Sequence, residues 1–344
     1  MIEFLENDLR QMEEMGITRE KVLKQIETFV EGIPYTRLER PAVVGDGILR
    51  FSEDESESII RKFDASDHSL TMLKFVPASG AASRMFKALF NFLSAFNPGK
   101  ESLEEYLQRT GDNDIRVFAE NLERFPFYEK VRDLVNEKFS DPGRALIAFI
   151  HKMLDASGLN FDFYPKGILP FHLYDSHVAT AFEEHLREAA DYAATEGKAQ
   201  LHFTISPQHE TLFKDTYGKI KERIEKETGT SFQVDYSFQK PSTDTIAVTP
   251  DNVPFRQADG SLLFRPGGHG ALIENLNEQD ADIVFIKNID NVAVPEIAKE
   301  SGASKKLLAG VLLDIQERAF RYAAMLEESG LTGEQVKEIK DFLK

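Results

Sequence analysis

The chain has 344 residues, of which 42% are hydrophobic and 29% charged, the balance of a soluble globular protein with one large or two ordinary domains. Its net charge of −17 argues against a large nucleic-acid surface, which needs lysine and arginine to meet phosphates. The absence of cysteine excludes disulfides, thiolate zinc sites and cysteine nucleophiles. No apolar run approaches the roughly 20 residues of a membrane span, and the acidic N-terminal segment is no secretion signal, so we expect a cytoplasmic protein without a membrane partner.

Residues 1–66 are predicted to form a helical region that packs on the core of the protein. Two helices fit residues 2–31, where Thr18 is a suitable N-cap for the second helix and Gly32 a suitable residue to end it. A third helix is expected at residues 52–63, where Ser52 begins a capped acidic turn. This pattern indicates packing helices and no catalytic unit.

A strand, a loop of small residues and a helix follow one another over residues 72–85. The apolar strand stops at Pro77, which cannot extend a ladder of hydrogen bonds. Small side chains at residues 78–83 let the backbone approach an anion, and the N–H groups at the start of the next helix favour its negative charge. That helix is expected from Arg84 to Phe96, and Arg84 adds a fixed cation suited to phosphate. The same pattern is also typical of a packing joint.

A long helical excursion is expected between about residues 97 and 158, inside the core domain. The segment that follows it, residues 161–175, contains two prolines that bar a continuous helix, so it is predicted to be a loop with a short strand that carries Lys166. On its own, Lys166 is typical of a surface turn. His172 and His177 are further pocket candidates, but they match no spacing of metal ligands.

Helices and strands alternate through the second half of the chain, which predicts βαβ units in an α/β fold with a largely parallel sheet. We expect the core domain at residues 67–300 and a C-terminal helical segment at residues 301–344. The expected strands are 200–206, 232–238 and 282–287, and the expected helices are 177–197, 208–227, 271–276, 295–301, 304–328 and 332–343.

Three further positions resemble ligand contacts. Gln239 ends a strand, and its amide can both donate and accept hydrogen bonds. The glycine-rich turn 266–270 comes directly before a helix, so that its backbone can lie flat against a ligand. Asp290 follows an apolar strand, and the carboxyl end of such a strand is where ligands bind in open α/β sheets. Each position also fits an ordinary strand end or turn.

Taken in order, these segments resemble the motifs of sugar-phosphate nucleotidyltransferases of the UDP-sugar pyrophosphorylase type. Residues 77–85 resemble the Pro-Ala-Gly-Gly-x-Gly-Thr-Arg-Met loop of that family, although Ser79 and Ala82 stand at two of its glycine places. The remaining motifs are Pro165-Lys166, Pro266-Gly267-Gly268-His269-Gly270 and Asn288-Ile289-Asp290-Asn291. The resemblance covers about residues 72–293 and implies a Rossmann-like, three-layer sheet of the GT-A-like kind, in a branch that is a domain of unknown function.

The resemblance implies a transfer reaction in which a sugar 1-phosphate and a nucleoside triphosphate, UTP by the place of Gln239, give a nucleotide sugar and pyrophosphate. Arg84 and Lys166 are the implied catalytic residues, Asp290 the ligand of Mg²⁺, and Asn288 a contact to the sugar or ribose. The implied nucleotide-binding residues are Ala78, Ser79, Gly80, Ala81, Gln239, Gly268, His269 and Gly270.

Two other functions remain open at this point. The altered glycine loop, together with the lack of a candidate for the family's second metal-binding aspartate, favours a non-catalytic protein that binds a nucleotide or nucleotide sugar. A glycosyltransferase of similar fold is the other alternative, and the cations Arg84 and Lys166 argue against it. The missing aspartate also indicates that the chain is either a fragment or a shortened relative. The sequence does not indicate the oligomeric state.

Overall fold

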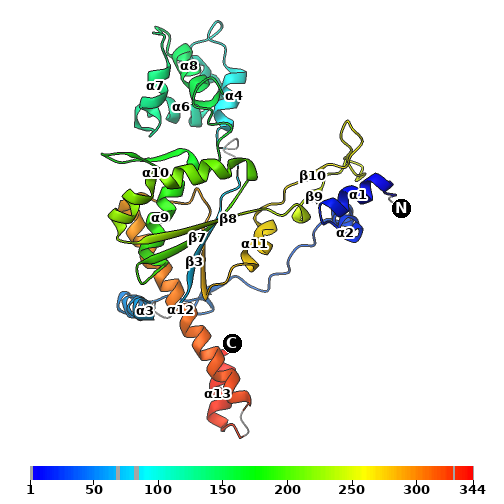
Figure 1. Cartoon of the computed structure of the whole chain (residues 1–344), viewed down its shortest axis with the longest axis vertical. Coiled ribbons are helices and arrows are strands. Elements are labelled where there is room, and N and C mark those ends of the chain that lie inside the picture. Colours follow the sequence, from blue (N-terminus) through cyan, green and yellow to red (C-terminus); the bar gives the residue numbers. More distant parts are fainter. Residues whose placement is uncertain (1–2, 67–69, 81–84, 328–329, 344) are drawn as a thin grey trace.

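The computed structural model describes residues 3–66, 70–80, 85–327 and 330–343 and shows a mixed α/β fold built around a five-stranded sheet (Figure 1). Four strands run parallel in the order β11-β3-β7-β8, and the short β6 pairs antiparallel with β7. The strands are β3 (Met72–Pro77), β6 (Ala194–Thr195), β7 (Lys198–Ile205), β8 (Ser231–Phe238) and β11 (Ile283–Ile286). Every residue of β3 is buried, as expected for a central strand that is covered on both faces.

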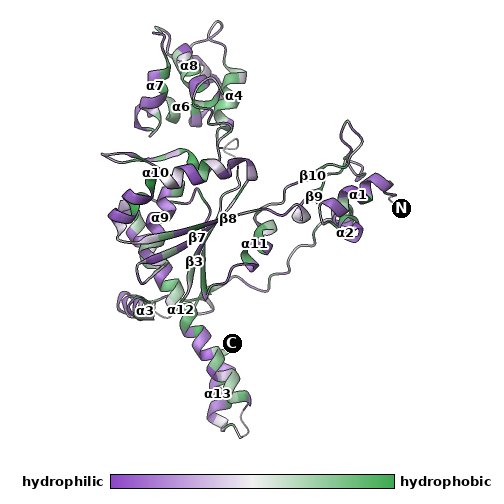
Figure 2. Ribbon diagram, in the orientation of Figure 1, coloured by the Kyte–Doolittle hydropathy of each residue, from purple (hydrophilic) through white to green (hydrophobic). Residues whose placement is uncertain are grey.

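Helices cover the sheet and bury its apolar residues. Figure 1 shows α9 (Ala181–Tyr192), α10 (Glu210–Thr228) and α12 (Pro295–Glu327) on one side and α11 (Ile273–Asn277) on the other. In Figure 2 the apolar colour follows the central strands, whereas the outer helices alternate between apolar and polar residues. Phe182, Phe203 and Phe213 meet in the main core. Among the described residues, no helix is both long and apolar enough to cross a membrane.

The expected helical excursion forms a lobe of its own beyond the carboxyl edge of the sheet (Figure 1). Its apolar core is rich in phenylalanine, and Ser102, Asp112 and Asp141 cap three of its helices through their side chains. The helices of the lobe are α4 (Lys87–Ala95), α5 (Leu103–Thr110), α6 (Asn113–Glu120), α7 (Tyr128–Leu134) and α8 (Pro142–Leu154), with a 3₁₀ turn at Leu122–Arg124.

The first two helices do not pack on the main core as the sequence predicts. α1 (Glu6–Glu14) and α2 (Arg19–Glu31) instead enclose a separate small core with the antiparallel pair β9 (Thr245–Ile246) and β10 (Phe264–Arg265). A short amphipathic helix has one apolar face to bury, and Ile246 and Leu262 provide the apolar surface against which these two helices pack. The intervening stretch is exposed and contains the small pair β1 (Val43–Val44) and β2 (Gly47–Ile48), whereas α3 (Glu53–Ser66) does reach the main core through Phe63.

Two helix boundaries differ from the prediction for physical reasons. α9 begins at Ala181 and not at His177, because β5 (Val178–Thr180) pairs with β4 (Pro170–Leu173) and Thr180 caps the helix. α12 runs without a break through Gly302 and across the expected domain boundary at residue 300. A Cβ at Gly302 would lie 1.8 Å from Asp191 Oδ2, so this glycine permits close packing against α9 and does not end a helix. α13 (Gly333–Phe342) packs back on α12.

Candidate functional site

The carboxyl ends of the four parallel strands lie along one edge of the sheet, on the side of the helical lobe (Figure 1). From β3 the chain adds β7 and β8 on one side and later β11 on the other. The strand order therefore reverses between β3 and β11, and open α/β sheets bind ligands outside such a point. The segments that leave the strands here begin at Ala78, Ser206, Gln239 and Lys287.

Lys166 and Asp290 meet at this edge, although 124 residues separate them. Lys166 Nζ donates to Asp290 Oδ2 at 2.5 Å, and the two side chains keep 22% and 35% of their surface exposed. Lys166 opens a 3₁₀ turn, Lys166–Ile168, whose Gly167 lies so close to Phe213 and Ile289 that a Cβ would come within about 3.1 Å of both. The backbone N–H of Lys166 makes a long hydrogen bond, 3.5 Å, to the carbonyl of Gly80. The lysine is therefore anchored to both the β3 loop and the β11 loop.

The loop that carries Asp290 is fixed from below by buried polar contacts. Ile289 N donates to the carbonyl of Pro77 at 3.2 Å, and the ring of His185 contacts the carbonyl of Ile289 through Nε2 at 3.1 Å. Burial, reinforced by the charge of Lys74, holds the pKa of His185 well below its usual range, so the ring is neutral and donates from Nε2. These contacts hold the backbone before Asp290 against β3 and α9.

Glu188 on α9 joins two lysines beneath the same loop. It accepts hydrogen bonds from Lys74 Nζ at 2.8 Å and from Lys287 Nζ at 2.6 Å. Burial acts to raise the pKa of Glu188, but the two ammonium groups outweigh it and lower the pKa to about 2. Burial lowers the pKa of Lys74 to about 7 against the opposing effect of Glu188. Lys287 is thereby held against α9 at the base of the loop.

A cavity of about 540 Å³ lies beside this pair, between the β3 loop and the glycine-rich turn. Ser206 Oγ donates to the carbonyl of Ser79 at 3.3 Å and closes one wall. A Cβ placed on Gly80 or Gly268 would meet nothing within 4 Å, so their backbones face open space. This volume and these bare backbones suit a ligand of nucleotide size.

Gln239 and Asp244 form the polar wall of the cavity. Gln239 Nε2 donates to Asp244 Oδ1 at 3.3 Å, and both side chains line the space. Burial raises the pKa of Asp244, and the hydrogen bond from Gln239 opposes that rise. The 3₁₀ turn Pro241–Thr243 brings the two residues together.

The glycine-rich turn differs from the expectation in one respect. It leads into a 3₁₀ turn, His269–Leu272, and only then into the short α11. The described φ angles of Gly267, Gly268 and Gly270 do not fall in the left-handed region. A Cβ on Gly267 would lie 2.9 Å from the Cβ of Ala271, so this glycine is required for space and not for backbone conformation.

The structure brings together six of the twelve residues that the sequence predicts for the site. Ser79, Gly80, Gln239 and Gly268 line the cavity, and Lys166 and Asp290 form the pair beside it. Four others fall elsewhere or outside the description. Ala78 is fully buried in the core and Gly270 is exposed away from the cavity lining, while Ala81 and Arg84 lie outside the described residues. The last two are Asn288 and His269.

Asn288 is half-buried in the turn before Asp290, where its carbonyl accepts from the N–H of Asn291 at 3.1 Å. The backbone of His269 belongs to the 3₁₀ turn, and its side chain lies outside what the structure describes. The helix expected to start at Arg84 begins at Lys87 instead. Among the described residues of this segment, Ser79 and Gly80 are the ones that line the cavity.

Sequence reasoning missed Ser206, Pro207 and Asp244, all of which line the cavity. Ser206 and Pro207 follow the strand β7, so the rule that ligands lie outside the carboxyl ends of parallel strands would have indicated them. Asp244 has no such signal, because it reaches the cavity only through the 3₁₀ turn after Gln239.

Comparison with protein families gives a match over residues 5–344. The chain belongs to the DUF4301 family, described as a domain of unknown function. This confirms the expectation that the chain falls in such a family. Neither the curated proteins nor the solved structures gave a significant match.

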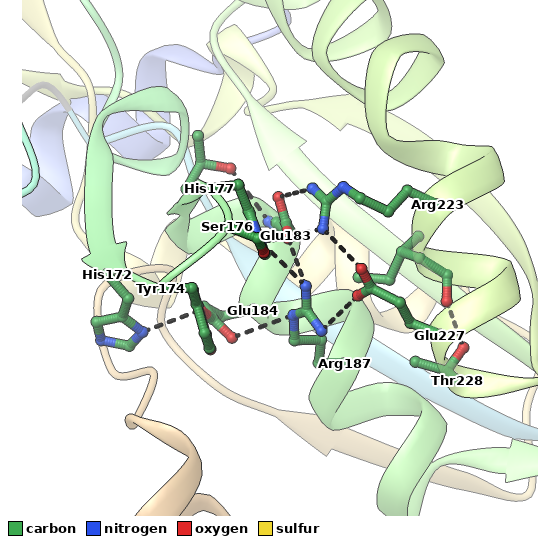
Figure 3. Close-up of polar contacts among 12 residues, drawn as sticks. His172, Tyr174, Ser176, His177, Glu183, Glu184, Arg187, Arg223, Glu227 and Thr228 are labelled. Atoms are coloured by element: carbon green, nitrogen blue, oxygen red, sulfur yellow. Dashed lines mark hydrogen bonds and ion pairs between the residues drawn. The ribbon is translucent and has the colours of Figure 1, made fainter.

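A second polar cluster of this DUF4301 chain lies away from the cavity, on α9, α10 and the β4–β5 pair (Figure 3). Glu183 accepts from Arg187 at 2.7 Å and from Arg223 at 2.8 Å, and His177 contacts it at 3.0 Å. Burial acts to raise the pKa of Glu183, but these arginines outweigh it and lower the pKa. The cluster fastens the β4–β5 pair to the helices.

Glu184 extends that fastening, since it accepts from Tyr174 at 2.8 Å and lies 3.0 Å from Nδ1 of His172. His172 and His177, candidates for a pocket by sequence, thus contact buried carboxylates and do not line the cavity at the carboxyl edge. In the part of the chain that the structure describes, no three His, Asp or Glu side chains are grouped to hold a metal.

A further cavity, of about 550 Å³, lies in the helical lobe. Its lining is mostly apolar and rich in phenylalanine, with Asn113 and Asp114 as its polar members. Neither cavity is lined by a lysine or arginine among the described residues, but the serines and bare glycine backbones at the carboxyl edge can donate hydrogen bonds to a phosphate, whereas the apolar lobe cavity offers few donors. The cavity at the carboxyl edge remains the candidate site.

Proposed function

We propose that this chain is a nucleotidyltransferase that joins a sugar 1-phosphate to a nucleoside triphosphate and releases pyrophosphate. The observation that carries the proposal is the meeting of Lys166 with Asp290 beside a cavity lined by Gly80 and Gly268. These segments are far apart in the chain and converge at the point where the strand order reverses. The order β8-β7-β3-β11 supports the Rossmann-like, GT-A-like form of the proposal.

In the proposed reaction, an oxygen of the sugar phosphate attacks the α-phosphorus of the triphosphate. The bond from the α-phosphorus to the oxygen bridging it to the β-phosphate breaks, and that oxygen leaves with pyrophosphate. Such a transfer needs mainly positioning and neutralisation of charge. The Lys166 ammonium would serve both needs, because its bond to Asp290 and the backbone bond from Lys166 to Gly80 hold it beside the cavity where the phosphates are proposed to bind. Arg84 is proposed to stabilise the departing pyrophosphate.

The site offers one carboxylate, that of Asp290, as a ligand for Mg²⁺. Asp290 offers one carboxylate at the edge of the cavity, and Mg²⁺ is commonly held by one or two carboxylates together with substrate phosphates and water. Asp290 would hold the ion, which when bound would neutralise charge on the phosphates. The protein supplies the anchored carboxylate and the neighbouring ammonium of Lys166.

A non-catalytic protein that binds a nucleotide is the second candidate. The absence of a metal-binding group of three side chains among the described residues favours it, as does Ser79 at a place where the resembled motif has glycine. The enzyme and the binding protein would use the same cavity, so a measurement of turnover distinguishes them.

Pyrophosphate release by the purified chain tests the proposal, with Mg²⁺, each of the four nucleoside triphosphates and a panel of sugar 1-phosphates. We expect release that depends on both substrates, and a loss of about 100-fold or more in Lys166→Met and Asp290→Asn. Lys214→Met and Asp280→Asn, at exposed positions away from the cavity lining, serve as matched controls and should keep full activity. Nucleotide binding without release would favour the second candidate, and the absence of any nucleotide binding would exclude both.

A further inference from the structure

We propose that the cavity selects guanine nucleotides through the hydrogen-bonded pair of Gln239 and Asp244. The proposal rests on the proposed function in one respect, namely that the cavity holds a nucleotide. It goes further by assigning Asp244 a role in recognition and by naming the base. It also replaces UTP, which the place of Gln239 alone suggests, with GTP.

The contact between the two residues fixes the orientation of the amide. A carboxylate can only accept hydrogen bonds, so Gln239 must turn its NH₂ group toward Asp244, as it does at 3.3 Å. The carboxylate keeps acceptor capacity beyond this one contact, and the amide keeps a second N–H. The polar wall therefore presents carboxylate lone pairs beside one amide donor.

Only guanine matches this pattern among the common bases. Its Watson–Crick edge carries two adjacent donors, N1–H and the N2 amino group, next to the acceptor O6. The Asp244 carboxylate can accept both donors while Gln239 donates to O6. Uracil places an acceptor on each side of its single N–H, and adenine and cytosine place a ring acceptor beside their amino group. A carboxylate facing those edges meets a lone pair, which disfavours them.

The position of the pair supports a contact to the base and not to the phosphates. Asp290 follows β11, and Gln239 follows β8, so three strand spacings separate them across the sheet. At about 4.8 Å for each spacing this is roughly 14 Å. The cation of Lys166 lies at the β11 end, and the bare backbone of Gly80, which follows β3, lies between the two ends. The glycine-rich turn lies at the β8 end, where a Cβ on Gly267 would come within 3.9 Å of Gln239 Nε2. A nucleotide with its phosphates near Lys166 would extend its base toward Gln239 and Asp244.

In the described contacts, the side chain of Asp244 does not hold another part of the fold in place. Its carboxylate accepts from Gln239 alone in the described contacts, whereas its backbone carbonyl accepts from Gln25 at 3.1 Å. The change Asp244→Asn keeps the shape of the side chain and the backbone contact, but it replaces one acceptor by a donor. It therefore tests recognition with little change to the fold.

The test is calorimetric titration of the full chain with GDP, IDP and UDP in the presence of Mg²⁺. IDP lacks only the N2 amino group of GDP, so the comparison removes one donor from the ligand without altering the protein. We expect GDP to bind about tenfold or more tightly than either IDP or UDP. In Asp244→Asn this preference should disappear, through a loss of GDP affinity of about tenfold with a much smaller change for UDP.

Asp251→Asn, an exposed aspartate on the β9–β10 segment, is the matched control and should keep the preference for GDP. Equal affinity of the unmodified chain for GDP and IDP would overturn the proposal. Because this comparison uses only the unmodified chain, it does not depend on whether a variant folds. A uniform loss of all three ligands in Asp244→Asn would also overturn it, since a contact to the ribose acts alike on every base. If UDP binds as tightly as GDP, the selection of guanine is overturned but the proposed nucleotide site still stands. If none of the three nucleotides binds, both the selection of guanine and the proposed function are overturned.

Discussion

The ring of His185 donates from Nε2 to the carbonyl oxygen of Ile289 at 3.1 Å, one peptide before the proposed metal ligand Asp290. Both partners are buried, so no water replaces the donor if the ring is removed. The contact links a helix under the sheet to the loop that carries the carboxylate. The geometry of the candidate site is therefore set partly by a residue that does not reach the cavity.

We expect His185→Leu to lower the free energy of unfolding by about 1–3 kcal/mol, because it leaves the carbonyl of Ile289 buried without a donor. Urea unfolding followed by circular dichroism measures this. His151→Leu, at a half-exposed histidine on α8, is the control and should change the free energy by less than about 0.5 kcal/mol. Equal effects of the two changes would contradict the structural role of His185.

Acid should weaken the fold through Glu188. Its pKa in the folded protein is about 2, below its ordinary value of 4.5, so it stabilises the folded state fully above about pH 4.5. That stability is lost as the pH falls from 4.5 to 2, and the shift corresponds to about 3 kcal/mol. Unfolding in urea at several pH values should show this fall in the native chain and a flatter profile in Glu188→Gln.

The same variant should be destabilised at neutral pH by about 3–5 kcal/mol, because removing Glu188 leaves the fully buried Lys74 without its carboxylate. Asp235→Asn, at a position on β8 whose carboxylate pairs only with nearby Gln233 in the described contacts, is a suitable comparison. If Glu188→Gln unfolds like the native chain at pH 7, the buried network contributes nothing to stability.

Two neighbouring glycines should separate stability from binding. A Cβ on Gly268 points into open space, so Gly268→Val should leave the free energy of unfolding almost unchanged while it obstructs the cavity and weakens nucleotide binding by about tenfold or more. A Cβ on Gly267 lies 2.9 Å from the Cβ of Ala271, so Gly267→Ala should destabilise the protein by about 1–3 kcal/mol. Thermal unfolding and calorimetry on both variants measure the two effects independently.

A second glycine pair tests the packing of the long C-terminal helix. Gly310→Ala would bring a methyl group to within 2.5 Å of Ile59 Cγ2 and 3.0 Å of the Ile59 carbonyl oxygen, and we expect a loss of about 1–3 kcal/mol as α12 moves away from α3. Gly218→Ala, on exposed α10 with nothing within 4 Å, should instead stabilise the protein by about 1 kcal/mol, since alanine is the better helix former. Opposite signs in a thermal melt are the expected result.

The central strands and the convergence at their carboxyl ends could be predicted from local sequence. The apolar run that ends at Pro77 and the run before Asp290 are short, β-branched or aromatic, and followed by turn residues. Parallel pairing then brings Gly80, Gln239 and Asp290 to one edge. These segments can be recognised as strands from the sequence because a strand that is buried on both faces has a continuous run of apolar residues.

Long-range contacts set the features that could not be predicted. Gly302 looks like a helix break until Asp191 is seen beside it, and nothing near α1 and α2 in sequence identifies the segment around Ile246 as their partner. Asp244 likewise enters the site only because a single 3₁₀ turn folds it back onto Gln239. Such choices depend on tertiary packing, which overrides local propensity.

The helical lobe leaves the sheet just after Gly80 and returns just before Lys166, and a backbone hydrogen bond joins these two points at 3.5 Å. The lobe is thus connected to the sheet at the residues proposed to bind phosphate. Lys166 lies between the loop after β3 and the lobe, whose apolar core includes Leu169 three residues further on. A ligand that binds the Lys166 ammonium would therefore bind at the joint between the lobe and the sheet.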